Sequence, residues 1–105
     1  MPYYDLNQVR VAALAEKVEF RGRNVGRDIA NLGYDLSDVI NCLIGLSEAD
    51  FHKTHKYENG DIDDAYRFEY KKQLVCGDIA DSLYIKFCLF NDCLEIDLAS
   101  FHLNR

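Results

Sequence analysis

Three side chains in the second half of the chain have the chemical types needed to cleave a phosphodiester bond without a metal ion: Lys53, Tyr84 and His102. Attack by a ribose 2′-hydroxyl needs a base for that hydroxyl, an acid for the 5′ oxygen and a cation for the phosphate charge. The unperturbed pKa of histidine lies near neutrality, so we assign acid–base work to His102. Lys53 would stabilise the phosphate, and Tyr84 would orient it or donate to it. This chemistry requires that all three meet on one sheet surface.

The last third of the chain predicts the β-hairpin that must position Tyr84 and His102. In Leu83–Phe90 apolar side chains occupy every second position, which is the period of a half-buried strand. Asn91-Asp92 is a short turn, and Cys93–Ser100 is expected to run back as the second strand. One face of this hairpin would be wholly apolar and belong to the core.

The register of the predicted hairpin decides what lies opposite Tyr84. A two-residue turn places Ala99 there, so His102 lies three positions beyond the partner of Tyr84. A bulge near Asp97-Leu98, or a wider loop, is needed to bring His102 opposite Tyr84. The same register puts Lys86 opposite Asp97. A cross-strand ion pair is the simpler interpretation of Lys86, and the other is a second cation at the phosphate.

Helix signals dominate the first half of the chain. Asp5 is a candidate N-cap for a first helix, and a second helix is predicted over residues 24–32. A third helix has Asp35 or Ser37 as its cap. Between the first two, Val18–Arg21 is short and alternating, as an isolated strand would be.

The pattern changes from helical to β after Lys53. Tyr66–Leu74 alternates and predicts a strand, whereas Cys76–Asp81, with its glycine and two aspartates, predicts a connection. We therefore expect a single α+β domain over residues 1–105, with N-terminal helices packed on one face of a C-terminal antiparallel β-sheet.

Composition limits the class of protein. Of the 105 residues 49% are hydrophobic and one is proline, which favours one folded domain over disorder. No apolar run approaches the roughly 18 residues of a membrane span, and no signal-peptide pattern is present. The four cysteines lack a C-x-x-C spacing, and we interpret them as buried, reduced thiols of a cytoplasmic protein.

The net charge of −6 disfavours binding of a phosphate backbone by bulk electrostatics. Any contact with RNA must then come from local clusters of cations. Arg21, Arg23 and Arg27 form one such cluster near the N-terminus, and Lys53 and Lys56 form another in the middle. A solvated surface is the simpler interpretation of each cluster.

His52 and His55 raise a zinc site as an alternative. They are three residues apart and, with His102 or Asp50, would supply nitrogen and oxygen ligands. Two histidines without a third convincing ligand are weak support for such a site. Neither a metal nor a cofactor is therefore predicted.

A series of motifs extends in order over nearly the whole chain. They are Tyr4-Asp5-Leu6, Asn31–Asp35, Ile44–Lys53, Asp64-Ala65-Tyr66, Leu83–Lys86 and Ser100-Phe101-His102. Together they resemble the MqsR-family toxins of bacterial toxin–antitoxin systems. The resemblance implies a RelE-like α+β fold and metal-independent cleavage of messenger RNA, free or on the ribosome. It also implies a cognate antitoxin as partner, and no membrane.

The same resemblance implies roles for single residues. Lys53 falls on the family's Lys after Asp-Phe-Tyr, and Tyr84 falls on the active-site Tyr of its Val-Tyr-Leu-Lys strand. His102 stands where the family's Ser-Phe-Lys ends, and Asp63, which would repel phosphate, stands where a polar residue is usual. The substrate-binding residues predicted around the catalytic set are Arg21, Arg23, Arg67 and Lys86.

An alternative function belongs to a different class of protein. The acidic balance, Asp63 and the Ser-Phe-His ending suit a catalytically degenerate domain that binds an antitoxin or the ribosome without cleaving RNA. Geometry separates the two hypotheses. Ring nitrogens of His102 that lie close enough to Lys53 and Tyr84 for one phosphate to contact all three side chains would support a working site.

Overall fold

The computed structural model describes residues 1–104 of the chain. Its elements in chain order are α1 (Leu6–Leu14), β1 (Val18–Phe20), α2 (Arg23–Asn31), α3 (Leu36–Gly45), a short 3₁₀ helix η1 (Glu48–Asp50), β2 (Phe51–Lys56), β3 (Ile62–Leu74), β4 (Gly77–Phe90) and β5 (Glu95–Leu103). None of the helices in this described part combines the length and the apolar character needed to cross a membrane.

The strands form one mixed sheet in the order β1-β5-β4-β3-β2. Neighbours are antiparallel except at one edge, where β1 runs parallel to β5 with Val18 beside Ile96. The expectation of a purely antiparallel sheet is therefore wrong, and so is that of an isolated strand at Val18–Arg21. Since β1 lies between two helices, no hairpin turn fixes its direction, and three residues carry too little pattern to reveal a partner.

Side-chain caps fix the starts of α1 and α3. Asp5 accepts a hydrogen bond of 2.8 Å from a backbone N–H two residues on, as an N-cap does. Of the two candidate caps for α3, Asp35 is the one used, because Asp35 and Asp38 each accept from the other's backbone N–H. The helix predicted over residues 24–32 is α2, displaced by one residue.

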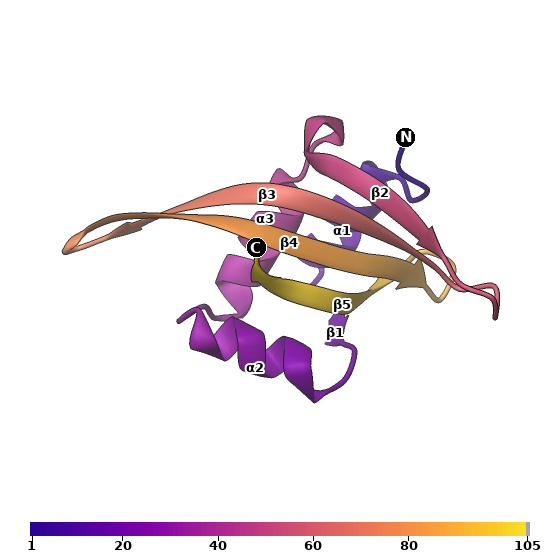
Figure 1. Ribbon diagram of the computed structural model, residues 1–105, viewed down its shortest axis with the longest axis horizontal. Helices are drawn as coiled ribbons and strands as arrows, with labels where there is room; N and C mark the ends of the chain where they lie inside the picture. Colours follow the sequence, from indigo (N-terminus) through magenta and orange to yellow (C-terminus); the bar gives the residue numbers. More distant parts are fainter. Residues whose placement is uncertain (105) are drawn as a thin grey trace.

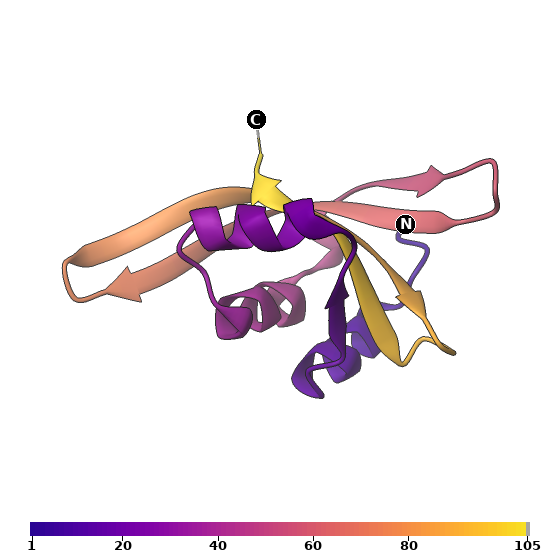
Figure 2. The ribbon, with the colours of Figure 1, turned by 90° about the horizontal axis from the view of Figure 1, so that it is seen from below.

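One face of the sheet carries the core, and the other is left open. Figure 2 shows the helices gathered on one side of the strands. Leu83, Ile85 and Phe87 of β4 are fully buried toward the helices, as the alternation predicted. The side chains that are fully buried with them include Val9, Val39, Leu43, Leu46, Tyr66, Ile96, Leu98 and Phe101. The opposite face of β4 therefore presents Tyr84 and Lys86.

β3 and β4 extend beyond the helices as a long hairpin (Figure 1). Their pairing continues to Leu74 and Gly77, so the prediction of a connection at Cys76–Asp81 is wrong for most of that segment. The side chains at the start of β4 are mostly exposed, so they gave this segment no core-facing period. Asp38 at the start of α3 accepts a hydrogen bond of 2.8 Å from Lys72 Nζ of β3. This ion pair links the hairpin to α3.

The four thiols are free and differ in exposure. Cys42 is buried, Cys88 and Cys93 are half-buried, and Cys76 is exposed near the tip of the hairpin. The expectation of four buried thiols is therefore wrong, most clearly for Cys76, because the projecting hairpin carries that residue away from the core.

Candidate active site

His102 lies directly opposite Tyr84 in the antiparallel pair β4–β5. The first cause is a wide loop. Phe90 pairs with Glu95, two positions beyond the partner that a two-residue turn would give. In the intervening Asn91–Leu94 segment, the first three residues have φ values of 53°, 57° and 65°. These left-handed residues widen the loop. The wider loop shifts the β4–β5 pairing by two of the three positions that separate His102 from the partner of Tyr84 in the register of a two-residue turn.

The second cause is a bulge in β5. Phe87 pairs with Leu98 and Lys86 with Ser100, so Ala99 is left without a partner in the ladder. This extra residue shifts the pairing by the remaining third position. The bulge also changes which side of the sheet each later residue faces. Leu98 is buried toward the helices, and strict alternation would send residue 102 the same way. With Ala99 as the extra residue, His102 lies on the open face.

Tyr84 and His102 form a stacked pair. Their ring centroids are 5.4 Å apart and the ring planes meet at 17°. His102 Nδ1 lies 2.8 Å from the carbonyl oxygen of Leu103, and a carbonyl only accepts, so Nδ1 carries the hydrogen. In the neutral ring Nε2 is then unprotonated and has a lone pair available as a base.

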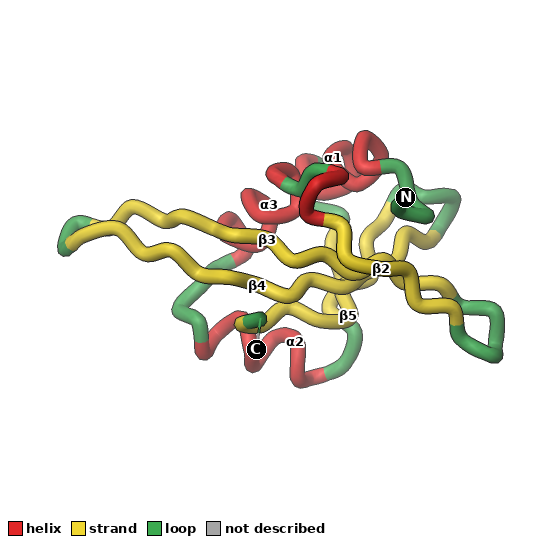
Figure 3. Tube along the Cα trace, turned by 45° about the horizontal axis from the view of Figure 1, so that its top comes forward, coloured by secondary structure: helices red, strands yellow, loops and turns green. Residues whose placement is uncertain are grey.

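Arg67 of β3 extends this pair into a row of three side chains across three strands. It lies opposite Tyr84 on the side away from His102. Arg67, Tyr84 and His102 line an open cleft of about 450 Å³ together with Asp28 of α2 and Asn104. Figure 3 shows the strands side by side, with α2 close to the C-terminal end of β5. The cleft therefore combines a guanidinium, a phenol and an imidazole.

Lys53 lies in the neighbouring row of the same face. The register runs from Lys53 of β2 through Ala65 and Lys86 to Ser100. A residue two positions along a strand is the next one on the same face, so this row adjoins that of Arg67, Tyr84 and His102. The small side chain of Ala65 separates the two lysines. Lys53 therefore lies one row from the stacked pair, and Lys86 lies beside Tyr84 on β4.

Two further histidines lie against Tyr84. His55 Nε2 is 3.2 Å from the Tyr84 hydroxyl, and His52 Nε2 is 3.4 Å from an Arg67 terminal nitrogen. A register shift between Phe51 and Lys53 makes His52 the extra residue of a bulge in β2. Sequence reasoning considered these histidines only as zinc ligands. Their places beside Tyr84 depend on the pairing of β2 with β3, and the polar pattern of β2 did not predict a strand there.

Burial and neighbouring charges shift the pKa values of His52, His55 and Tyr84. Burial, followed by the charges of Lys86 and Lys53, lowers the pKa of His55, and Asp63 opposes this change. The pKa of His52 is lowered by desolvation and then by the charges of Arg67 and Lys53. Burial raises the pKa of the Tyr84 phenol, against the opposing charge of Arg67. Both histidines therefore favour the neutral imidazole, and Tyr84 keeps its hydrogen.

Arg21 is engaged by carboxylates. Its two terminal nitrogens lie 2.9 and 3.0 Å from the two oxygens of Asp63, and its Nε lies 2.8 Å from Asp97 Oδ2. Asp63 is fully buried, and burial alone would raise its pKa. Hydrogen bonds from Arg21 and Tyr57 outweigh that effect and lower the pKa of Asp63. The charge of Asp63 is therefore paired, which weakens the repulsion of phosphate expected from sequence.

The other two predicted substrate-binding cations differ in position. The predicted Lys86–Asp97 pair is wrong, because the wider loop places Asp97 opposite Cys88. The loop and the bulge together pair Lys86 with Ser100. Arg23 is exposed at the first turn of α2, two residues after Arg21. The structure thus brings together Arg67, Lys86 and the three catalytic candidates, and it places Arg21 and Arg23 at the end of β1.

Within residues 1–104, no group of three or more His, Cys, Asp or Glu side chains is arranged to hold a metal ion. The zinc alternative that joined His52 and His55 to His102 or Asp50 therefore has no geometric support in this part of the chain.

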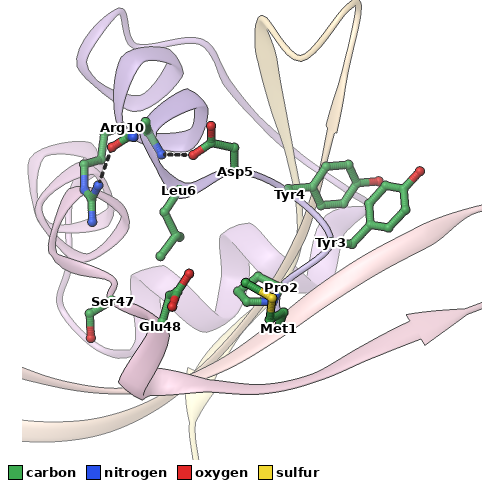
Figure 4. Close-up of a pocket in the computed structure, with 10 residues that line it drawn as sticks. Met1, Pro2, Tyr3, Tyr4, Asp5, Leu6, Arg10, Ser47 and Glu48 are labelled. Atoms are coloured by element: carbon green, nitrogen blue, oxygen red, sulfur yellow. Dashed lines mark hydrogen bonds between the residues drawn. The ribbon is translucent and has the colours of Figure 1, made fainter.

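A second cavity of about 450 Å³ lies away from this site, between the N-terminal segment and η1. Figure 4 shows Arg10 and Glu48 on its wall. Arg10 donates a hydrogen bond of 2.9 Å to the side-chain oxygen of Asn7. Arg10 also donates to the backbone carbonyls of Ile44 and Leu46. The polar groups of Arg10 thus hold α1 against the end of α3.

A family model described as "Motility quorum-sensing regulator, toxin of MqsA" covers residues 1–103. A search of curated proteins finds no match. The matched range contains every residue predicted to be catalytic or substrate-binding.

Proposed function

We propose, from the premise that the chain belongs to the MqsR family of toxins, that it cleaves messenger RNA as a metal-independent endoribonuclease. As the toxin of a toxin–antitoxin system, it has an antitoxin of the MqsA type as its expected partner. The carrying observation is the stacked Tyr84–His102 pair, which the Ala99 bulge turns onto the cationic open face.

The chemistry follows from the positions of the hydrogen atoms. His102 Nε2 accepts the proton of the ribose 2′-hydroxyl, and the 2′ oxygen forms a bond to the adjacent phosphorus. The bond between phosphorus and the 5′ oxygen breaks, and that oxygen takes up a proton from a water molecule. The proton that His102 Nε2 accepted then restores this water, and the ring returns to its neutral form. The products are a 2′,3′-cyclic phosphate and a 5′-hydroxyl end.

The remaining groups act on the phosphate. Arg67 and Lys53 stabilise the negative charge that develops on the non-bridging oxygens, and Tyr84 donates a hydrogen bond to one of them. Lys86, beside Tyr84 on β4, adds positive charge to the same face. Removal of one such donor from a preorganised site typically slows catalysis by about 10²–10³-fold.

The net charge of −6 favours the second candidate function, a domain that binds its antitoxin or the ribosome without cleaving RNA. The charge distribution supports cleavage instead. Asp63 and Asp97, two acids of the open face, are both bound to Arg21. Asp28 is the acid that lines the cleft itself. Lys53, Lys86 and Arg67 therefore bring three positive charges to a face where Arg21 offsets part of the acidic charge.

One experiment separates the two candidates. The purified chain is incubated with a messenger RNA in the presence of EDTA, and the ends of the products are analysed. Cleavage that leaves 2′,3′-cyclic phosphates supports the proposal, and His102→Ala should abolish it. Lys17→Ala, which changes an exposed cation outside the site, is the matched control. Intact RNA with the wild-type chain supports the binding domain.

A further inference from the structure

We propose that His55 is a positioning residue for the reaction, and that its hydrogen bond sets the direction of the Tyr84 hydroxyl. The inference rests on the proposed ribonuclease function. It concerns a residue that the resemblance and the family match leave without a role.

Tyr84 is held at two separate places. Its ring stacks on His102 of β5, and its hydroxyl lies 3.2 Å from His55 Nε2 of β2. Stacking fixes the plane of a ring but leaves the phenol hydrogen free to rotate. The contact with His55 is the one that selects where this hydrogen points.

Neighbouring side chains also hold the ring of His55 in place. Its ring stacks on Tyr57, with centroids 6.3 Å apart and planes at 11°. The Tyr57 hydroxyl donates to Asp63 Oδ2 over 3.0 Å, and Arg21 holds both oxygens of that carboxylate. His55 and Asp63 are also direct partners in the β2–β3 ladder. The imidazole therefore rests on a bonded set of side chains from three segments.

The surroundings of His55 favour its neutral ring. Burial, followed by the charges of Lys86 on β4 and Lys53 on its own strand, lowers the pKa of His55. His52 acts in the same direction, and Asp63 on β3 opposes them. A neutral imidazole offers either a donor or an acceptor at Nε2. Phosphate oxygens only accept, so with RNA bound the phenol hydrogen goes to the phosphate. His55 then donates from Nε2 to the phenol oxygen.

The test is a double-mutant cycle on RNA cleavage. We expect His55→Ala to lower kcat about tenfold, the loss that corresponds to one hydrogen bond, with KM nearly unchanged. His55→Gln, whose amide bonds the phenol, should recover most of the rate, whereas His55→Phe, which keeps only the ring, should not. In a Tyr84→Phe background all three changes should have no further effect. Equal losses in both backgrounds, or equal rates for the Gln and Phe variants, would overturn the proposal.

A second readout separates this inference from the proposed function. The ring nitrogen signals of His55 are recorded by NMR in the free wild-type chain and in Tyr84→Phe. Loss of the phenol should shift the Nε2 signal, and an unchanged signal overturns the positioning role even if RNA is cleaved. If the signal shifts but no RNA is cleaved, the ribonuclease proposal fails. The hydrogen bond between His55 and Tyr84 is then confirmed, but it has no role in catalysis. Thermal unfolding of each variant checks that the fold is kept.

Discussion

Tyr84 and His102 stack on the open face because one residue of β5, Ala99, is left out of the β4–β5 ladder. A loop two residues wider than the shortest hairpin would bring their backbones nearly opposite without it. It would not turn the imidazole to the same side of the sheet as the phenol. Face selection by a single extra residue is therefore the feature on which the candidate site depends.

Deletion of Ala99 tests this dependence directly. The deletion restores strict alternation and turns His102 toward the helices, so cleavage of RNA should fall at least 100-fold, on the order of the loss of an acid–base group. Ala99→Gly keeps the residue count and should keep most of the activity. The comparison is made by timed cleavage of one labelled RNA, and an active deletion variant would contradict the assignment of His102.

Replacement of His102 tests the acid–base role. His102→Gln retains size and polarity but has no basic ring nitrogen, so the cleavage rate should fall by about 10²–10⁴-fold. The KM should change much less, because binding of the phosphate depends on the cations. Arg67→Ala is the informative comparison, and it should raise KM as well as lower kcat. A His102→Gln variant with wild-type kcat would refute the mechanism.

Replacement of Arg21 tests whether this side chain is structural. Arg21→Ala leaves the buried carboxylate of Asp63 without its charged partner, and we expect a loss of about 1–3 kcal/mol in the free energy of unfolding. The low end of that range applies because the Arg21 side chain is 41% exposed. Urea unfolding measures the change, with Arg27→Ala as an exposed control. Equal stability of both variants would show that the Arg21–Asp63 contact contributes nothing measurable.

The pH dependence of stability tests Asp63 independently. Its pKa is lowered in the folded state, because its bonds to Arg21 and Tyr57 outweigh burial. A lowered folded pKa contributes stability above the unfolded pKa of about 3.9, and that contribution is lost as the pH falls through the folded value. The free energy of unfolding should therefore decrease below about pH 4. Asp63→Asn should be less stable at neutral pH and should show a weaker decrease in acid.

Much of the fold could be predicted where a single period covers a whole element. The alternation of Leu83–Phe90 identified the buried face of β4, and Asp5 identified the start of α1, because each signal is local. For α3 the sequence left Asp35 and Ser37 as alternatives, and the structure uses Asp35. The direction of β1 and the extent of the β3–β4 hairpin were missed. Both depend on pairing with distant strands whose exposed or short segments carry no period.

The candidate site was predicted by residue type but not by geometry. Sequence reasoning named Tyr84 and His102 and stated that a bulge or a wider loop was needed, and the structure contains both. It did not place His55 beside Tyr84, because that contact arises from the register of β2 on β3. Strand register is set by pairing across the sheet, so contacts between side chains on different strands are the hardest to predict from a single sequence.

The order of the strands also constrains when the sheet becomes complete. β5 comes after every other strand in the sequence, yet it lies between β1 and β4. Until this segment has been synthesised, β1 has no neighbour to pair with and the core-facing side of β4 lacks Phe101. A ribosome that is still making the chain therefore carries an unfinished sheet, so the face that joins Tyr84 to His102 is complete only after β5 has been added.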